Sequence, residues 1–557
     1  MTFGTMDVQA IARLLSGKKL VVLGGAGISR ESGLPIANEL TDEILRHLRM
    51  SKPSKDVMAL ARPPFELFIE TLAGCSDVSP LYEIYQRAAP CMFHRLCAQL
   101  WNDGLLSAVV TTNFDTLFED ALHAKGIDYD RFWQEAELSN WAPTMGRLPL
   151  IKLHGSAHDE RSLGATIRRV ANQRGVRARE AALCTAFRAA DVEFILVAGY
   201  SGSDKFDLNP ALGRLAFTAP PVALIAHRSG KGISAVVEPL SGHVKAGPFA
   251  AFQGVRIECE TSALLLEMMS PDSTIKNSFP PDHEWHEQVS MWFTRALKKH
   301  KEAFRAYMCG ALLRAAARPR HALRWFKKAL NLPASSWLKI EILLSLARCE
   351  RDVGESVEGA QRAAGKALRL ARKHNLPDHE IRALIELGVI AADLRRYTHA
   401  LRYYKQAENH ARITGESEKI GICLGNAGIV RKNMGGRRRW LRALRDYDAA
   451  IEIARQTGDK RSEGRTIGNL GILHSVMGNP PLAITHFREA AGIARDLGDL
   501  YHEAIWLVCE ADDTFTNDPA KAIDLVQLAR KMFLPLSKAR VKECDDHLRR
   551  FHRTSHP

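Results

Sequence analysis

An apolar run that ends in a cluster of glycines, near the N-terminus, constrains the fold of this chain more than any other stretch. Residues Leu20–Leu23 are continuously apolar, which is typical of a buried parallel strand. The run breaks at Gly24-Gly25-Ala26-Gly27, and the chain is predicted to resume as a helix capped by Ser29 or Ser32. A strand, a glycine turn and a helix N-terminus can cradle a phosphate, because the backbone approaches closely and free N–H groups favour negative charge. The turn alone, without a third glycine, fits a nucleotide site and a plain tight turn equally well.

Strand and helix patterns alternate from this first strand to about residue 257. Helical patterns include Met6–Leu15, Pro64–Leu72 and Phe93–Asp103. The strand candidates are Leu20–Leu23, Ser107–Thr111, Leu148–Leu153, Phe194–Ala198, Val222–Ile225 and Gly254–Ile257. Short strands divided by helices predict an α/β doubly wound parallel sheet of Rossmann-like type.

Three residues suited to ligand binding or catalysis follow strand candidates directly, as the glycine turn does. Asn113, His154 and Gly199 each lie just beyond a strand, and ligand-binding loops in doubly wound sheets follow the carboxyl ends of strands. Structural roles are also open to them. Asn113 is placed to cap a helix starting at Phe114, and His154 to bond the backbone at a strand end.

Four motifs, in their order along the chain, resemble those of the sirtuin family. They are Gly25-Ala26-Gly27-Ile28-Ser29 with Ser32-Gly33-Leu34-Pro35, then Thr112-Asn113-Phe114-Asp115, Leu153-His154-Gly155 and Gly199-Tyr200-Ser201-Gly202. The resemblance covers roughly the first 270 residues. It implies a sirtuin-like domain whose glycine turn binds NAD.

The resemblance also implies a role for each matching residue. Those expected to bind NAD are Gly25, Ala26, Gly27, Ser29, Asp115, Gly199 and Ser201. Asn113 would hold a water or a ribose hydroxyl near the anomeric carbon, and His154 would act as the base. These residue types suit the chemistry, because loss of nicotinamide leaves an oxocarbenium-like cation. A neutral amide can orient water beside that cation, and an imidazole can take the water's proton near neutral pH.

Departures from the sirtuin pattern point away from protein deacylation. Pro35 is followed by Ile36-Ala37-Asn38, where deacylases carry Asp-Phe-Arg. Deacylases also insert a four-cysteine zinc module after the catalytic His-Gly, whereas here an arginine-rich segment, 168–188, contains only Cys184. None of the ten cysteines forms a C-x-x-C pair, so we expect no metal site and no disulfide framework.

Sirtuin-like domains without the zinc module, fused to repeats, are typical of bacterial anti-phage proteins that hydrolyse NAD. The resemblance therefore implies an NAD+ glycohydrolase in abortive infection, with water in place of acyl-lysine as the nucleophile. Two alternatives stay open. One is a non-hydrolytic scaffold that binds NAD or ADP-ribose, and the other is a protein deacylase or ADP-ribosyltransferase.

The second half of the chain is helical and repetitive. Equivalent positions are occupied by Ala400-Leu401 with Tyr404, Ala443-Leu444 with Tyr447, and Ala483-Ile484 with Phe487. Weaker copies predict about six helix pairs in all, and the units resemble tetratricopeptide repeats. In such repeats we expect small residues to let the two helices of a pair approach, and aromatics to fill the gap to the next pair. An irregular helical bundle is the alternative.

The predicted organisation is a sirtuin-like domain over residues 1–270, a linker rich in Pro, Ser and Asp over 271–285, and a repeat domain over 286–557. No apolar run is long enough to span a bilayer, and the N-terminus lacks a signal-peptide pattern. We therefore expect a cytoplasmic protein.

Charge divides unevenly between the two halves. Residues 1–275 have a net charge of −2 and residues 276–557 a net charge of +16. A basic run that includes Arg437, Arg438, Arg439 and Trp440 is either a solvated surface or a docking patch. We expect the repeats to bind a phage-derived protein trigger, with nucleic acid as a less favoured partner, and the chain to form a homo-oligomer.

Overall fold

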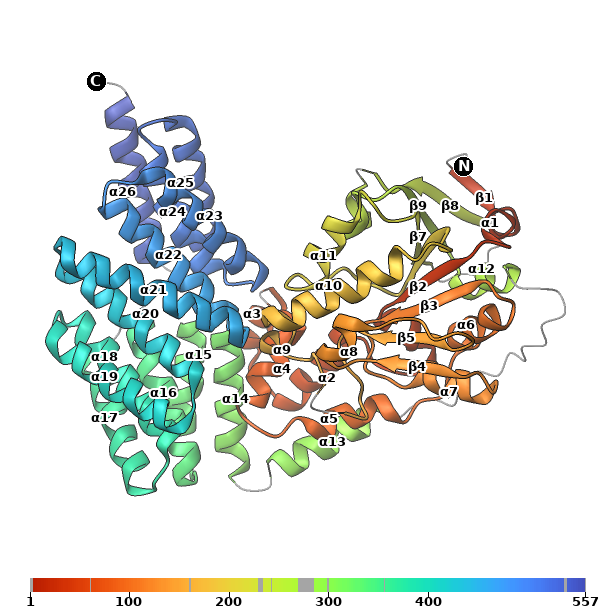
Figure 1. Ribbon diagram of the computed structural model, residues 1–557. Coiled ribbons are helices and arrows are strands. Elements are labelled where there is room, and N and C mark those ends of the chain that lie inside the picture. The colour runs from red at the N-terminus through yellow and green to blue at the C-terminus, as the bar shows by residue number, and fades with distance from the viewer. Residues whose placement is uncertain are drawn as a thin grey trace. The chain divides into compact units, whose positions relative to one another are not determined.

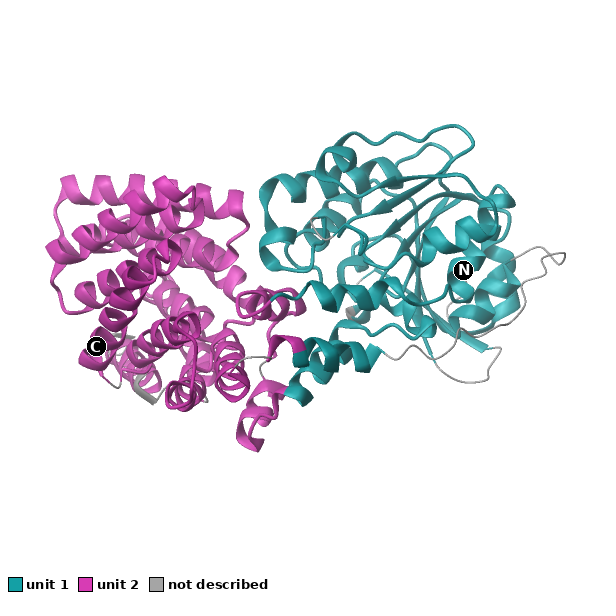
Figure 2. Ribbon diagram, turned by 90° about the horizontal axis from the view of Figure 1, so that it is seen from below, with its two compact units in different colours: residues 1–47, 77–294 teal, residues 48–76, 295–557 magenta. Residues whose placement is uncertain are grey.

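The computed structural model describes residues 4–60, 62–159, 162–228, 234–241, 243–268, 285–297, 300–354, 356–534 and 538–555. They form two compact units, coloured separately in Figure 2. Unit 1 comprises Met1–His47 and Asp77–Thr294, and unit 2 comprises Leu48–Ser76 and Arg295–Pro557. The predicted linker, 271–285, lies outside the described residues except for Trp285, the first residue of helix α13 (Trp285–Ala296).

Unit 1 is built on one sheet, in which nine strands occur among the described residues, in the order β1-β8-β9-β7-β6-β2-β3-β5-β4 (Figure 1). The strands are β1 (Gly4–Asp7), β2 (Leu20–Gly24), β3 (Leu106–Thr111), β4 (Tyr129–Phe132), β5 (Leu148–Lys152), β6 (Phe194–Ala198), β7 (Val222–His227), β8 (Ser234–Pro239) and β9 (Gly254–Cys259). All six predicted strands are present, and they pair in parallel. The unpredicted strands β1, β4 and β8 are partly exposed and lack a continuous apolar run.

Helices cover both faces of this sheet (Figure 1). The helices of unit 1 are α1 (Val8–Leu15), α2 (Ala37–Leu48), α5 (Ser79–Tyr82), α6 (Met92–Asn102), α7 (Leu117–Ala124), α8 (Glu135–Asn140), α9 (Ile167–Ala171), α10 (Gln173–Phe187), α11 (Leu208–Leu215), α12 (Thr261–Glu267) and α13, with the 3-10 helices η1 (Ala26–Ser32), η2 (Glu83–Gln86) and η3 (Val244–Phe249). Leu20 and Val22 pack with α1, α6 and α12, whereas Val21 and Leu23 pack with α10 and α11. Alternate side chains of β2 thus enter two separate cores, which confirms the predicted doubly wound α/β architecture.

The strand register aligns the predicted site residues at one edge of the sheet. Gly24, the last residue of β2, pairs with Thr111 on one side and with Ala198 on the other, and Thr111 pairs in turn with Lys152. The chain therefore leaves four adjacent strands at the same level. Because β2 is the strand from which the sheet is extended in both directions, this edge is the switch point where doubly wound sheets bind ligands.

Every secondary-structure element described in unit 2 is a helix. Its helices are α3 (Lys52–Leu60), α4 (Phe65–Ala73), α14 (Lys301–Ala315), α15 (Pro319–Leu330), α16 (Ser336–Val353), α17 (Val357–Lys373), α18 (Pro377–Asp393), α19 (Tyr397–Thr414), α20 (Ser417–Met434), α21 (Arg437–Thr457), α22 (Lys460–Val476), α23 (Pro480–Asp496), α24 (Leu500–Thr514), α25 (Pro519–Phe533) and α26 (Lys538–Ser555). Among the described residues, consecutive helices from α14 to α25 pack in six pairs. Each pair also packs on the next. The predicted helical repeat is confirmed.

The packing of the repeat aromatics goes beyond the expectation. A Cβ added to Gly428 of α20 would lie 2.6 Å from the ring of Tyr447 in α21, and one added to Gly471 of α22 would lie 2.7 Å from Phe487 in α23. Each aromatic ring therefore covers the small residue of its own pair. The glycine leaves a hollow that the ring of the same pair fills, and the predicted packing toward the next pair is also present, since Phe487 stacks on Trp506 of α24.

One stretch from the first half of the sequence belongs to the repeat unit. The indole Nε1 of Trp325 donates a hydrogen bond of 3.0 Å to Ser54 Oγ, and the Cys309 thiol lies 3.7 Å from the Leu48 carbonyl oxygen. Helix α4 packs on α14. The predicted helix Pro64–Leu72 exists as α4 and separates β2 from β3 along the chain as expected, but it belongs to unit 2. No helix in the described part of the chain is both long and apolar enough to cross a membrane.

Candidate active site

The glycine turn is shaped by its neighbour, the loop that follows β6. Gly25 N–H donates to the Ala198 carbonyl over 3.0 Å, and Gly27 N–H donates to the Gly199 carbonyl over 2.9 Å. A Cβ on Gly25 would lie 2.6 Å from the Gly199 oxygen. Gly199 itself has a φ of +65°, in the left-handed region that favours glycine. Glycine is thus required at these positions by close backbone packing as well as by any ligand.

The chain after the turn forms the 3-10 helix η1, and the α-helix α2 begins only at Ala37. Neither Ser29 nor Ser32 caps a helix, because η1 starts at Ala26 with Gly25 at its N-cap and no capping side chain. The predicted capping role is wrong. Ser29 is buried, and its hydroxyl is engaged elsewhere in the site.

Asn113, Ser29 and Asp115 form a buried chain of hydrogen bonds, which we call the amide arm. Asn113 Nδ2 donates to Ser29 Oγ over 2.9 Å, and Ser29 Oγ donates to Asp115 Oδ2 over 2.8 Å. Asn113 N–H is held by Thr111 Oγ1 at 3.0 Å. Helix α7 begins at Leu117, so Asn113 does not cap it. Asn113 Oδ1 is buried and has no hydrogen-bond partner, which leaves one good acceptor free beside the glycine turn.

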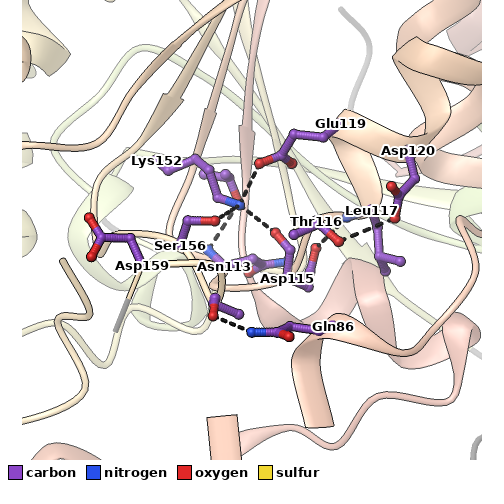
Figure 3. Close-up of polar contacts among 12 residues, drawn as sticks. Gln86, Asn113, Asp115, Thr116, Leu117, Glu119, Asp120, Lys152, Ser156 and Asp159 are labelled. Atoms are coloured by element: carbon purple, nitrogen blue, oxygen red, sulfur yellow. Dashed lines mark hydrogen bonds and ion pairs between the residues drawn. The ribbon is translucent and has the colours of Figure 1, made fainter. Parts of the chain in front are cut away.

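A buried lysine supports this arm (Figure 3). Lys152 Nζ is fully buried and donates to Glu119 Oε1 at 2.8 Å, to Ser156 Oγ at 3.1 Å and to the Asp115 carbonyl at 2.5 Å. Burial raises the pKa of the Asp115 carboxyl, although the charge of Lys152 and the Ser29 hydroxyl oppose the rise. Asp115 Oδ1 also accepts from Leu117 N–H, so Asp115 serves both the arm and the start of α7.

His154, Asp207 and Arg179 form a second buried set, which we call the imidazole arm. His154 Nε2 lies 3.1 Å from Asp207 Oδ2, and Arg179 Nε lies 2.8 Å from the same oxygen. Burial would lower the pKa of His154, but the charge and hydrogen bond of Asp207 outweigh it and raise the pKa above its usual value. Burial would likewise raise the pKa of Asp207, but His154 and Arg179 lower it. The His154 ring is therefore fixed in orientation and its protonated form is stabilised.

Sequence reasoning found His154 but missed its partners Asp207 and Arg179, because other elements carry them. Asp207 is the N-cap of α11, where it accepts from Leu208 N–H, and Arg179 lies within α10. Asp207 is 53 residues from His154 along the chain, and only the fold brings them together. Arg179 belongs to the arginine-rich segment noted in the sequence. Sequence reasoning also missed Lys152, which a lysine within the otherwise apolar strand candidate Leu148–Leu153 could have signalled.

Two side chains of this arm and the neighbouring Asp204 lie close enough together to suggest a metal site. His154, Asp204 and Asp207 offer ligand atoms within 4.8 Å of one another. However, Asp207 already engages both His154 and Arg179, and the guanidinium supplies the positive charge that a cation would bring. This set therefore does not resemble a prepared cation site. The expectation of no metal, which rested on cysteine spacing, stays a prediction.

The remaining predicted residues lie at the surface of the turn. Ala26 and Gly27 are exposed. Ser201 is exposed, and its hydroxyl is 2.8 Å from that of Ser203. The structure thus joins Ser29, Asn113 and Asp115 by hydrogen bonds and packs Gly25 and Gly27 on Gly199, whereas the hydroxyl of Ser201 contacts that of Ser203 in its own loop.

Comparison with known proteins shows sirtuin-like sequence in unit 1. Residues 107–216 match the SIR2-like domain, an NAD-related domain, and this range contains both Asn113 and His154. The chain is 31% identical over 118 residues to NAD-dependent protein deacetylase 1 of Streptomyces coelicolor. That match covers 21% of this chain and 36% of the relative, so it spans about a third of the relative's length.

Similar solved structures cover the helical unit. A tetratricopeptide repeat protein from Parabacteroides merdae covers 48% of this chain and 92% of its own, with 16% identity and a TM-score of 0.32. A Rap protein in complex with competence and sporulation factor covers 48% of this chain and 80% of its own, with 15% identity and a TM-score of 0.36.

Proposed function

We propose that unit 1 hydrolyses NAD+ to nicotinamide and ADP-ribose. The observation that carries the proposal is the free, buried Oδ1 of Asn113 beside the glycine turn, on the same sheet edge as the oriented base His154. An unpaired buried amide oxygen is costly unless a ligand satisfies it. A water or a ribose hydroxyl can donate to it.

The imidazole arm supports the proton transfer that hydrolysis needs. His154 Nε2 faces Asp207, so Nδ1 is the nitrogen left to accept a proton. Asp207 stabilises the imidazolium that results, and in the neutral imidazole its bond to Nε2 places the proton on Nε2, which leaves Nδ1 as the acceptor. Water held near Asn113 would lose its proton to His154 as it attacks the anomeric carbon, while nicotinamide departs with the bonding electron pair.

Resolution of the reaction products tests this proposal. Purified full-length protein is incubated with NAD+, with and without an acetylated lysine peptide, and the products are separated by chromatography. Equal amounts of nicotinamide and ADP-ribose, unaffected by the peptide, are expected. Deacetylated peptide with O-acetyl-ADP-ribose would instead support a deacylase, for which the similarity to the Streptomyces deacetylase is the specific observation. Bound but uncleaved NAD+ would support a regulatory scaffold.

We also propose that the repeat unit controls this activity in anti-phage defence. Uncontrolled NAD+ loss would harm the host, so the isolated chain should be restrained until a phage-derived protein binds the repeats, with assembly into a homo-oligomer as one route to activation. The excess positive charge of residues 276–557 suits an acidic trigger. Arg437, Arg438 and Arg439 are exposed at the start of α21, whereas Trp440 is half-buried and donates to the Lys432 carbonyl at 3.3 Å. The arginines, rather than the indole, are thus available for docking.

A further inference from the structure

Lys152, which is fully buried, ties together the two loops that carry the amide arm and the imidazole arm (Figure 3). Its Nζ donates to the Asp115 carbonyl in the loop after β3 and to the Ser156 hydroxyl in the loop after β5. The same Nζ lies 2.8 Å from Glu119 Oε1 of α7, as an ion pair. A buried ion pair adds little net stability compared with apolar side chains of the same size. A role in the site is therefore the better explanation for a charge at this position.

The hydrogen bonds of the amide arm run in one direction, and that direction requires Asp115 to be ionised. Leu117 N–H donates to one carboxylate oxygen of Asp115 at 3.2 Å, and the Ser29 hydroxyl donates to the other at 2.8 Å. Because its one hydrogen is used in this way, Ser29 Oγ acts as the acceptor for Asn113 Nδ2. Asn113 therefore turns Oδ1 away from Ser29, and this is the oxygen that has no protein partner.

Uptake of a proton by Asp115 would reverse this chain. A protonated carboxyl group donates to Ser29 Oγ, which frees the serine hydrogen to point at Asn113. The amide would then present Oδ1 to Ser29 and turn Nδ2 toward the ligand. An N–H group cannot accept a hydrogen bond from a water or a ribose hydroxyl, so the arm would lose the acceptor on which the proposed hydrolysis depends.

The charge of Lys152 opposes that protonation. Burial raises the pKa of the Asp115 carboxyl, and among the effects that lower this pKa the charge of Lys152 is the largest. Asp120 of α7 and Tyr85 of η2 are also within electrostatic reach, since the Asp115 carboxylate raises the pKa of each. Neither of these groups nor Glu119 can bring a positive charge. Lys152 thus supplies the charge that keeps Asp115 ionised.

We propose that Lys152 is a positioning residue of the candidate site, which acts through Asp115 to keep the Asn113 amide oxygen turned toward the ligand. The inference rests on the proposed hydrolysis of NAD+ and identifies what sets the ligand-binding side of the amide arm. The hydrogen bonds of Lys152 hold the two loops, and its charge sets the direction of the hydrogen bonds in the arm. Loss of the charge, rather than of side-chain volume, should therefore disturb ligand binding.

Removal of the charge from the full-length protein tests this proposal. Lys152→Met/Glu119→Leu replaces the ion pair with apolar side chains of similar volume, and Lys152→Gln/Glu119→Gln is a second neutral pair that keeps hydrogen-bonding groups. At neutral pH each neutral pair should raise the KM for NAD+ about tenfold, the effect of losing one hydrogen bond, with a smaller fall in kcat. The matched control, Arg256→Met, removes a buried cation that pairs with Glu238 of β8 and Glu258 of β9, and it should leave KM unchanged.

The pH dependence of KM separates positioning from a general loss of structure. Without Lys152 the pKa of Asp115 should rise further, so the KM of the neutral pairs should recover toward wild type as pH rises through that pKa. Asp115→Asn, an isosteric change that cannot ionise, should raise KM at every pH, and adding Lys152→Met/Glu119→Leu to it should cause no further rise. The proposal is overturned if the neutral pairs keep the wild-type KM, if their defect does not change with pH, or if it adds fully to that of Asp115→Asn. Should neither neutral pair fold, Asp115→Asn decides alone, and an unchanged KM overturns the proposal.

Unfolding measures the same effect without NAD+. Because burial raises the pKa of Asp115, the folded chain binds more protons at this carboxyl than the unfolded chain, and the free energy of unfolding falls as pH rises between the two pKa values. This fall should extend to higher pH in the neutral pairs than in wild type, and Asp115→Asn should remove the difference. A wild type that neither binds nor cleaves NAD+ would refute the proposed hydrolysis. An equal pH dependence of stability in wild type and in the neutral pairs would instead refute the role of Lys152.

Discussion

The two arms of the candidate site differ in how completely they are satisfied. In the imidazole arm, the Asp207 carboxylate has two buried partners, the His154 ring and the Arg179 guanidinium, within about 3 Å. In the amide arm the groups are joined by neutral side chains, and Asn113 Oδ1 is left without a partner. The imidazole arm is held by ionic contacts, although Arg179 Nε makes no hydrogen bond of good geometry, whereas the amide arm has an acceptor without any partner.

This difference suggests a division of roles. A set of buried side chains held by ion pairs changes little when ligand arrives, so it suits a group that must hold a fixed orientation and exchange a proton. An unpaired buried acceptor gains the most when a ligand donates to it. The amide arm should therefore determine the position of the ligand, and the imidazole arm should determine the rate of proton transfer.

The largest effect should come from removing either end group. Asn113→Ala and His154→Ala should each lower NAD+ hydrolysis at least ~100-fold, which is the lower range for general acid–base groups. Nicotinamide release by purified, folded variants measures this. His158→Ala replaces an exposed histidine nearby and is the matched control. Wild-type turnover in both site variants would remove these residues from the mechanism.

Removing the partner of the imidazole should change both stability and pH dependence. Asp207→Asn leaves Arg179 as an uncompensated buried charge, which should destabilise the fold by roughly 3–5 kcal/mol in denaturant unfolding. The double variant Arg179→Gln/Asp207→Asn removes both charges and should recover part of that loss. If the single and double variants unfold alike, the ion pair is not what stabilises this arm.

The pH profile of Asp207→Asn gives an independent readout. Asp207 raises the pKa of His154, so in wild type the active, deprotonated base accumulates only as pH rises through a value above the usual histidine range. Without that carboxylate, burial dominates and lowers the pKa. The acidic limb of kcat/KM should therefore move to lower pH in the variant. An unchanged limb would show that His154 is not the group titrating.

A smaller effect is expected at the glycine turn. In Gly25→Ala the new Cβ would lie 2.6 Å from the Gly199 oxygen, so the two loops must separate. We expect a loss of roughly 1–3 kcal/mol in stability and weaker NAD+ binding. Gly213→Ala, in α11 with no atom within 4 Å of the added Cβ, is the control and should be neutral or slightly stabilising. Equal melting temperatures for the two variants would contradict the packing role.

The smallest effect on the purified enzyme should come from the surface arginines. Arg437→Gln/Arg438→Gln/Arg439→Gln should leave basal NAD+ turnover unchanged, since these residues lie in the repeat unit and are exposed. In phage-infected cells the same variant should lose less NAD+ than wild type, and its response should depend less on salt. A full response by the variant would place the trigger elsewhere.

Much of the site could be predicted because its residues follow strand ends. The apolar strands β2, β3, β5 and β6 are unmistakable in sequence, and parallel strands bring their carboxyl ends to one edge. That argument alone placed Asn113 and His154 together. The amide arm required only the short step from Asn113 to Ser29 across adjacent strand ends.

The rest depends on contacts that sequence spacing does not encode. Asp207 meets His154 only because α11 starts beside the end of β5, and nothing in the chain marks that aspartate. Helix α4 has an ordinary amphipathic sequence, so its place in unit 2 could not be distinguished from a place on the sheet. The edge strands β1 and β8 are partly exposed and lack the pattern that identified the others.

The most direct test of the account is hydrolysis of NAD+ in oxygen-18-labelled water by wild type and by His154→Ala. A long incubation at high protein concentration detects even slow turnover by a restrained enzyme. The account predicts nicotinamide release by wild type, one labelled oxygen at the anomeric carbon of ADP-ribose, and at least ~100-fold less product with His154→Ala. Nicotinamide release without label in ADP-ribose, or equal product from both proteins, would contradict it.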